Sequence, residues 1–132
     1  MPNADAPLVL VADDEREVAG LVAVILSRAG VRATTAVNGT EALEVIAERS
    51  PDAAVLDIMM PDMNGYEVVQ RVRSDPTTSS MPLILLSARA GKIDRDYGLR
   101  IGADAYFRKP FDPQALVETL RTLIEAGRDD TV

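Results

Sequence analysis

The sequence contains no cysteine and no histidine among its 132 residues. Without cysteine there are no disulfides and no thiolate metal sites, and a reducing compartment is favoured. Without histidine, the commonest general base and the commonest zinc or copper ligand are missing as well. A metal bound by this chain would therefore be held by oxygen atoms, which favours Mg²⁺, Ca²⁺ or Mn²⁺.

Basic residues are in the minority: 14 lysines and arginines face 21 aspartates and glutamates, giving a net charge of −7. A surface that binds nucleic acid has to neutralise phosphates with basic side chains, so we expect no direct binding of nucleic acid. Only two of the basic residues are lysines, Lys92 and Lys109. A lysine at a chemically special position is therefore informative.

Long hydrophobic runs are also missing. Apolar runs such as residues 8–12 and 83–86 have the length of strands and are far too short to span a membrane. Residues 1–5 offer neither a basic segment nor an apolar stretch of signal-peptide length. We therefore expect a soluble cytoplasmic protein that does not bind membranes.

Short apolar runs alternate with amphipathic segments along a chain whose length fits one domain. The runs have the length of strands, and the segments between them repeat apolar residues at helical spacing. The expected strands are residues 8–12, 32–36, 53–56, 82–86 and 105–107, and the expected helices are residues 14–29, 39–49, 66–73, 92–101 and 113–126. Five repeats of strand and helix predict an α/β fold, a doubly wound parallel sheet with helices on both faces.

Two expected helices begin with a capping signal. Asp14 followed by Glu17 is a capping-box pattern at the start of the first helix. Asp112 before Pro113 is the N-cap pattern of the last helix, with proline at the first helical position.

The expected helix at residues 92–101 has few apolar side chains. Only Ile93, Tyr97 and Ile101 fall on one face. Because a helix in a protein is stabilised mainly by its buried apolar face, we expect this helix to be weakly anchored through that stripe.

Chemically distinctive side chains stand where the expected strands end. They are Asp13, Asp14, Asp57, Ser87 and Lys109. Each alone has an ordinary explanation as a turn residue, a helix cap or a solvated surface charge. Parallel strands, however, end at the edge where open α/β sheets bind their ligands, and the ordinary explanations predict no such coincidence.

Three carboxylates gathered at one edge call for a cation. Like charges at close range disfavour joint ionisation, and a hard divalent cation removes that conflict. Mg²⁺ is typically bound by one or two carboxylates together with phosphate oxygens and waters, and Mn²⁺ could replace it. With Lys109 on the other side of an incoming phosphoryl group, a carboxylate such as Asp57 is arranged to attack phosphorus.

In order and separation, these motifs resemble the receiver domain of bacterial two-component response regulators. The matching segments are residues 9–15, 56–65, 85–88, 102–106 and 109–111. Each is a weak pattern alone, but together they are highly specific. The resemblance implies a flavodoxin-like sheet of five strands in the order 2-1-3-4-5 with five flanking helices. It covers residues 8–126, which leaves residues 1–7 as an N-terminal extension and residues 127–132 as a polar C-terminal tail.

The resemblance implies a role for each residue at the strand ends. Asp57 would accept a phosphoryl group from a sensor histidine kinase or a phosphotransfer protein. Asp13, Asp14, Asp57 and the backbone carbonyl of Met59 would bind Mg²⁺. Lys109 would contact a phosphoryl oxygen. The chain would thus be a signalling protein that catalyses only its own phosphorylation and dephosphorylation.

The resemblance also implies a switch. Ser87 would donate its hydroxyl to the phosphoryl group on Asp57, and Tyr106 would swing inward as Ser87 moves. The helix at residues 92–101 would take up most of the change, so that its face with the fifth strand and last helix meets a downstream protein target. Two chains could also pair through this face on phosphorylation.

Two further positions would tune the lifetime of the phosphorylated state. The side chains of Met59 and Arg89 should flank the path of an attacking water, so we predict slow self-dephosphorylation. The resemblance also implies a cis peptide bond between Lys109 and Pro110.

Three alternatives fit parts of the pattern. A phosphatase of the haloacid dehalogenase type needs an acid–base aspartate two residues after its nucleophile, where this chain has Met59 after Asp57. A flavin-binding domain needs a phosphate loop after the first strand, where residues 13–15 would repel phosphate. A pseudo-receiver that signals without phosphorylation usually lacks a site residue. The chain is either a stand-alone regulator or the receiver part of a longer protein, and residues 127–132 fit both.

Overall fold

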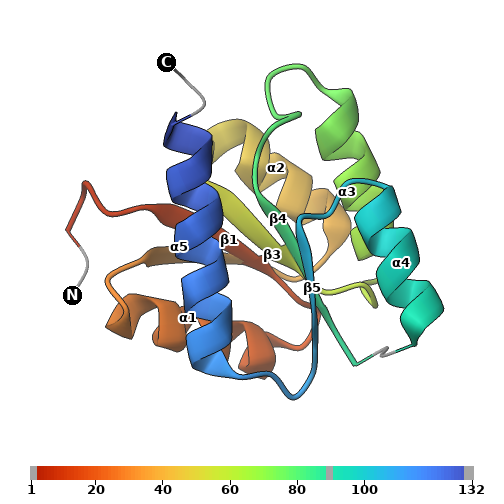
Figure 1. The fold of residues 1–132 in the computed structure, drawn as a ribbon, viewed down its shortest axis with the longest axis horizontal. Coiled ribbons are helices and arrows are strands. Elements are labelled where there is room, and N and C mark those ends of the chain that lie inside the picture. The colour runs from red at the N-terminus through yellow and green to blue at the C-terminus, as the bar shows by residue number, and fades with distance from the viewer. Residues whose placement is uncertain (1–2, 89–90, 130–132) are drawn as a thin grey trace.

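The computed structural model describes residues 3–88 and 91–129, which form alternating strands and helices. The strands are β1 (Leu8–Ala12), β2 (Arg32–Ala36), β3 (Ala53–Leu56), β4 (Leu83–Ser87) and β5 (Ala105–Arg108). The helices are α1 (Arg16–Arg28), α2 (Gly39–Arg49), α3 (Gly65–Ser74), α4 (Lys92–Arg100) and α5 (Pro113–Asp129) (Figure 1).

All five strands are parallel and lie in the order β2-β1-β3-β4-β5, which confirms the predicted fold class. The strand order reverses between β1 and β3, the position where ligands bind in open α/β sheets. β1, β3 and β4 are buried along their whole length, as their unbroken apolar runs predict. β2 and β5 are the edge strands and are only partly buried.

The sheet separates two hydrophobic cores. Leu10, Leu56 and Leu85 point to one face and join side chains of α2 and α3, while Val55 and Ile84 point to the other and join α1 and α5. Figure 1 shows α5 in front of the strands and α2 behind them. Full burial of one such aliphatic side chain contributes about 1.5–3 kcal/mol, so the two layers hold the strand ends in fixed positions.

The N-cap predicted for the last helix is confirmed, and the capping box that would be the ordinary explanation of Asp14 is not formed. Asp112 Oδ1 accepts the N–H of Gln114 at 3.0 Å, as an N-cap before Pro113 should. The residue before α1 is Glu15, and it makes no side-chain capping hydrogen bond. The predicted Asp14–Glu17 capping box does not form because Asp14 lies with the carboxylates at the strand ends.

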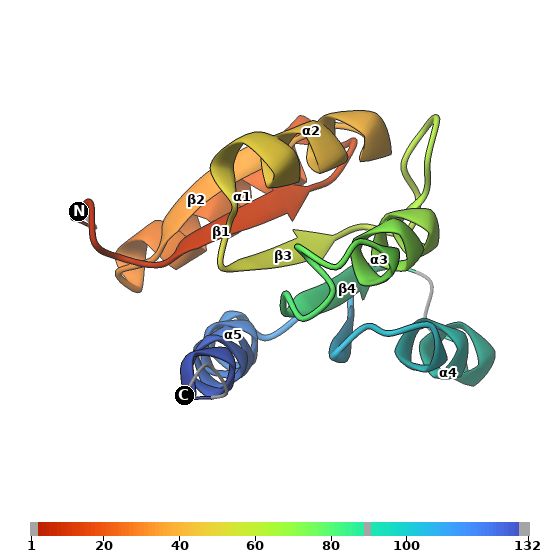
Figure 2. The ribbon, with the colours of Figure 1, turned by 90° about the horizontal axis from the view of Figure 1, so that it is seen from above.

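α4 is attached through only part of the predicted apolar stripe. Ile93 is 85% exposed, whereas the ring of Tyr97 packs edge-on against Tyr66 with centroids 4.8 Å apart, and Ile101 packs against the core. The buried residue of α4 is Gly98, where a Cβ atom would lie 2.7 Å from Leu85 Cδ1. The backbone of α4 therefore packs directly on the sheet at Gly98. Seen from above in Figure 2, α4 lies at the end of the sheet away from β2.

Arg73 joins the loop between α3 and β4 to the segment that follows α4. Its guanidinium donates to the carbonyl oxygens of Gly102 at 2.9 Å, Ser79 at 3.1 Å and Met81 at 2.6 Å. It also forms an ion pair with Asp104 at 3.0 Å. We refer to these contacts as the Arg73 cluster. They fix the C-terminal end of α4 relative to α3.

α5 continues to Asp129, past residue 126, where the sequence suggests a polar tail. The proposed division of the chain at residues 7 and 126 stays a prediction. Among the helices of the described residues, none has the length and apolar character needed to cross a membrane.

Candidate functional site

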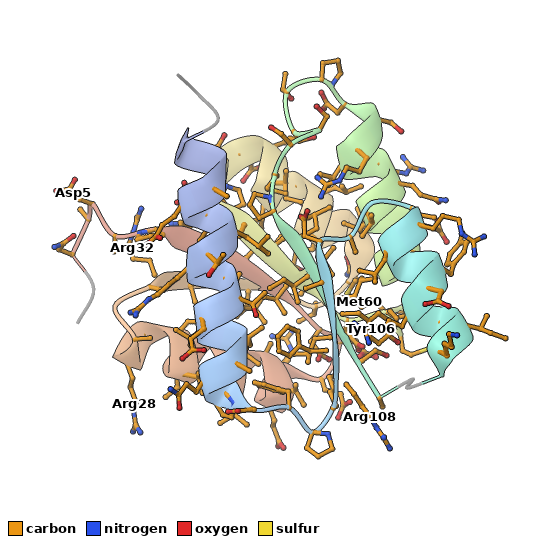
Figure 3. All side chains as sticks on the ribbon, viewed as in Figure 1. Asp5, Arg28, Arg32, Met60, Tyr106 and Arg108 are labelled. Carbon is orange, nitrogen blue, oxygen red and sulfur yellow. The ribbon has the colours of Figure 1, made fainter. Side chains whose placement is uncertain are left out.

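Backbone hydrogen bonds between strand ends bring the predicted site residues together. The N–H of Asp57 donates to Ala12 O at 2.8 Å, which aligns the end of β3 with the end of β1. The N–H of Lys109 donates to Ser87 O at 2.8 Å, which aligns the end of β5 with the end of β4. All four strand ends therefore lie at one edge of the sheet. Figure 3 labels Tyr106 and Arg108 on β5, near this edge.

Three carboxylates meet there, as predicted. Asp13, Asp14 and Asp57 each offer one oxygen, and these oxygens lie within 4.8 Å of one another. Asp13 and Asp57 are only 2% and 4% exposed, while Asp14 is exposed. Asp13 Oδ1 accepts the N–H of Glu15 at 2.9 Å, which fixes its orientation. We refer to these three carboxylates as the acidic cluster.

Lys109 lies against the acidic cluster. Its Nζ is 2.7 Å from Asp13 Oδ2 and 3.6 Å from Asp57 Oδ2. The Lys109–Pro110 peptide bond is cis, as the resemblance implies. Burial disfavours the ammonium, but the hydrogen bond to Asp13 and the negative charge of Asp57 outweigh it and raise the pKa of Lys109. Lys109 is therefore a permanent cation at this site.

The Asp57 carboxyl is harder to ionise than an ordinary aspartate. Burial raises its pKa and the charge of Asp13 adds to this, while Lys109 and the backbone N–H of Met59 act in the opposite direction. Three carboxylates against one ammonium leave the site two charges negative. A divalent cation would balance these two negative charges, and the carboxylate oxygens present are the ligands that such a hard cation prefers.

The loop after β3 depends on a close approach of two backbones. A Cβ atom on Gly65 would lie 2.5 Å from the carbonyl oxygen of Asp57, so only glycine fits. The Gly65 N–H donates to Ile58 O at 3.0 Å. Asn64 accepts the N–H of Glu67 at 3.0 Å and thereby caps α3. The backbone at the start of α3 thus packs directly on the backbone of Asp57 and Ile58 at the end of β3.

Residues 9–121 match the family model of the response regulator receiver domain. The chain belongs to this family. Among curated relatives, the receiver domain is 34% identical to the transcriptional regulatory protein GltR of Pseudomonas aeruginosa over 126 residues, which are 96% of this chain and 52% of GltR. The chain therefore spans about half the length of this relative.

Solved structures agree with this assignment. The receiver domain of a Francisella response regulator superposes with a TM-score of 0.86 at 32% identity, covering 92% of this chain and 98% of that one. The chemotaxis protein CheY4 of Vibrio cholerae superposes with a TM-score of 0.83 at 30% identity, covering 89% and 98%. Receiver domains act in two-component signalling, and they generally bind Mg²⁺ at an acidic cluster of the kind seen here.

The predicted switch residues Ser87 and Tyr106 and the predicted lifetime residue Met59 lie around the same edge. Ser87 is fully buried at the end of β4, and Tyr106 is partly buried against the core that includes Leu85. The Met59 side chain is exposed beside Asp57. Arg89 lies outside the described residues. Their roles in switching and in the phosphoryl lifetime stay predictions.

Sequence reasoning missed Asp62. Its carboxylate accepts hydrogen bonds from Gly39 and Thr40 at the start of α2. Asp62 stands inside the matched segment 56–65, but its partners lie more than twenty positions earlier. No local pattern connects the two, so only the fold could show this contact.

A stability measurement tests the electrostatics of the site. The folded chain holds the proton of Asp57 more tightly than the unfolded chain, so the ionised carboxylate lowers stability at neutral pH. This loss shrinks as the pH falls through the raised pKa and is gone below about 4, the usual pKa of aspartate. Without divalent cations, Asp57→Asn should therefore raise Tm at pH 7, and the gain should shrink toward pH 4.

Asp75 provides a control of the opposite sign. Hydrogen bonds from the N–H and hydroxyl of Thr77 lower the pKa of Asp75, so Asp75→Asn should not raise Tm at pH 7. Thermal unfolding of both variants between pH 4 and pH 8 checks the prediction. A Tm of Asp57→Asn below that of the parent at pH 7 would contradict it.

Proposed function

We propose that this chain is a phosphorylation-dependent switch in which Asp57 accepts a phosphoryl group from a histidine kinase or a phosphotransfer protein, in a reaction that requires Mg²⁺ or Mn²⁺. The observation that carries the proposal is the setting of Asp57. Its buried carboxylate lies among two further carboxylates and 3.6 Å from the ammonium of Lys109. A nucleophile placed between an acidic pair and a fixed cation suits phosphoryl transfer, where charge stabilisation supplies most of the catalysis.

Each residue would have a distinct part in the transfer. A carboxylate oxygen of Asp57 forms the bond to phosphorus while the bond from phosphorus to the donor breaks, and the donor leaves with that electron pair. Lys109 would turn from Asp13 toward the phosphoryl oxygens, and Ser87 would donate its hydroxyl to another of them. Mg²⁺, when bound by Asp13, Asp14, Asp57 and the Met59 carbonyl, neutralises charge on the transferring group.

Intact-protein mass after incubation with acetyl phosphate tests this function. With Mg²⁺, the parent should gain one phosphoryl mass, and Asp57→Asn should gain none. Omitting Mg²⁺ should abolish the gain in the parent, while Asp75→Asn should behave like the parent because Asp75 lies in a separate exposed loop. A parent that stays unmodified although it is folded and binds Mg²⁺ would contradict the proposal. It would favour a pseudo-receiver that interacts without phosphorylation.

The proposed output is a change of the surface formed by α4, β5 and α5. Phosphorylation adds about two negative charges at Asp57, which favours the state in which Ser87 and Lys109 close on the phosphoryl group. Tyr106 would follow Ser87 inward, and α4 would move. A downstream protein in the cytoplasm, or a second copy of this chain, would then bind the altered surface. Met59 and Arg89 would screen the phosphoryl group from water and prolong its lifetime.

A further inference from the structure

A contact between the loop after β3 and the start of α2 stands outside the machinery described so far. Asp62 Oδ1 accepts the N–H of Gly39 at 3.2 Å, and Asp62 Oδ2 accepts the hydroxyl of Thr40. The N–H of Met63 donates to the same carboxylate at 2.6 Å. One exposed side chain thus binds two residues of α2 and its own loop. We refer to this arrangement as the Asp62–α2 contact.

The backbone around Asp62 is shaped for this contact. Asp62 has a φ of +62°, a left-handed conformation that non-glycine residues seldom adopt. On the other side, a Cβ atom on Gly39 would lie 2.4 Å from Met63 O, so the start of α2 touches the loop backbone directly. The loop thus contributes an uncommon backbone conformation at Asp62, and α2 contributes a position, Gly39, where only glycine fits. Both partners of the contact are therefore shaped for it.

The same short loop also reaches the phosphoacceptor. The backbone N–H of Met59 donates to the Asp57 carboxylate. Between Met59 and Asp62 the chain is tightly folded: Met60 N–H donates to Ile58 O at 3.1 Å, and Met63 N–H donates to Pro61 O at 2.7 Å. A short, tightly folded loop moves as one unit, so a displacement at one end is transmitted to the other end. Displacement of Asp62 would therefore displace Met59.

We propose that Asp62 is a positioning residue that holds the loop on α2 so that Met59 is presented to Asp57, and that the state of the Asp57 site is felt in return at Gly39 and Thr40. The reciprocity follows from linkage, because a contact that favours the occupied site must itself be favoured by occupancy. The inference rests on the proposed function for its rate measurement but not for its metal-binding measurement. It adds the start of α2 as a second region that responds to phosphorylation, on the opposite side of α3 from α4.

The first experiment removes the contact without touching Asp57 or Met59. Thr40→Val removes the hydroxyl donor at nearly constant volume, and Asp62→Asn removes the charge while tolerating the left-handed conformation. Each should weaken Mg²⁺ binding and slow phosphorylation by acetyl phosphate by about threefold to tenfold, the net effect of one ordinary hydrogen bond. Asparagine at this position keeps one acceptor oxygen, so the double variant should lose less than the sum of the two single losses, since both substitutions weaken the same contact.

Two matched controls accompany these variants. Thr40→Ser keeps the hydroxyl and should retain parental Mg²⁺ affinity. Asp75→Asn removes an exposed aspartate whose carboxylate accepts the N–H of Thr77 at 3.0 Å and the Thr77 hydroxyl within its own turn. If Thr40→Val and Asp62→Asn bind Mg²⁺ and accept phosphoryl groups as these controls do, Asp62 is not a positioning residue.

The second experiment measures the reverse direction. In the parent, titration with Mg²⁺ should shift the backbone amide resonances of Gly39 and Thr40 and slow their hydrogen exchange. Asp57→Asn should abolish this response, and Thr40→Val should weaken it. A purely structural role for Asp62 would leave the Gly39 amide unaffected by Mg²⁺, and that outcome would overturn the inference. If acetyl phosphate fails to modify the parent while these shifts appear, the proposed function is wrong and the coupling still holds.

Discussion

Lys109→Met should slow phosphorylation of Asp57 by about a hundredfold or more, the usual effect of removing one preorganised charge from a transition state. The same substitution should tighten Mg²⁺ binding. Lys109 Nζ lies 2.7 Å from Asp13 Oδ2, so it occupies a carboxylate of the proposed metal site. Removing this cation leaves the acidic cluster more negative and Asp13 free to bind the metal. Catalysis and metal affinity should therefore change in opposite directions.

The other lysine provides the control. Lys92 is exposed at the start of α4, and Lys92→Met should change neither the phosphorylation rate nor the Mg²⁺ affinity by more than about twofold, as expected of a surface residue away from the site. Lys109→Met leaves the buried Asp13 without its cation, which should lower Tm in the absence of metal. Mg²⁺ should then raise its Tm by more than it raises that of the parent. Weaker Mg²⁺ binding by Lys109→Met would contradict the competition between lysine and metal.

Gly65→Ala should destabilise the fold by about 1–3 kcal/mol or more, because the added methyl group overlaps atoms that cannot move independently. Its Cβ would lie 2.5 Å from the backbone oxygen of Asp57. Relief requires α3 to move away from the end of β3, which also displaces the Asp57 carboxylate. Mg²⁺ affinity should therefore fall together with Tm.

Gly20→Ala is the matched control substitution, and we expect it to stabilise the fold rather than destabilise it. Gly20 lies inside α1 and has no atom within 4 Å of an added Cβ. Alanine there should stabilise the chain by about 0.5–1 kcal/mol, since it lowers the entropy that the helix loses on folding. Thermal unfolding of both variants, with Mg²⁺ titrations at a temperature where both are folded, separates the two effects. Equal Tm changes in the two variants would show that the contact at Asp57 is not tight.

The central strands were predictable because an unbroken apolar sequence is what a strand buried on both faces requires. β1 and β3 are buried on both faces, so their residues are apolar without interruption, and their predicted bounds match the structure. β4 lies one residue further along the chain than predicted, and α3 extends one residue further at each end. The site was predictable for a topological reason, since parallel strands deliver their carboxyl ends to one edge.

Two local patterns describe the structure only in part. The capping-box pattern at Asp14 does not form a cap, and the apolar stripe of α4 packs at Tyr97 and Ile101 but not at Ile93. Asp14 belongs to the acidic cluster, and α4 packs through the backbone at Gly98 rather than through Ile93. The Asp62–α2 contact escaped prediction because its partners are distant in sequence. Local patterns thus predicted elements reliably and predicted attachments poorly.

The Arg73 cluster constrains how α4 can move. The backbone just past the C-terminal end of α4 is bound at Gly102, and the helix rests on the sheet at Gly98, while Ile93 near its other end is 85% exposed. The N-terminal half of α4 is held by the Tyr66 hydroxyl, which donates to Asp94 O at 3.2 Å, and by the edge-on contact between the rings of Tyr66 and Tyr97. A swing of this helix about Gly98 would therefore have to break both contacts with Tyr66, and a binding partner that senses the swing would gain most by contacting the N-terminal turn.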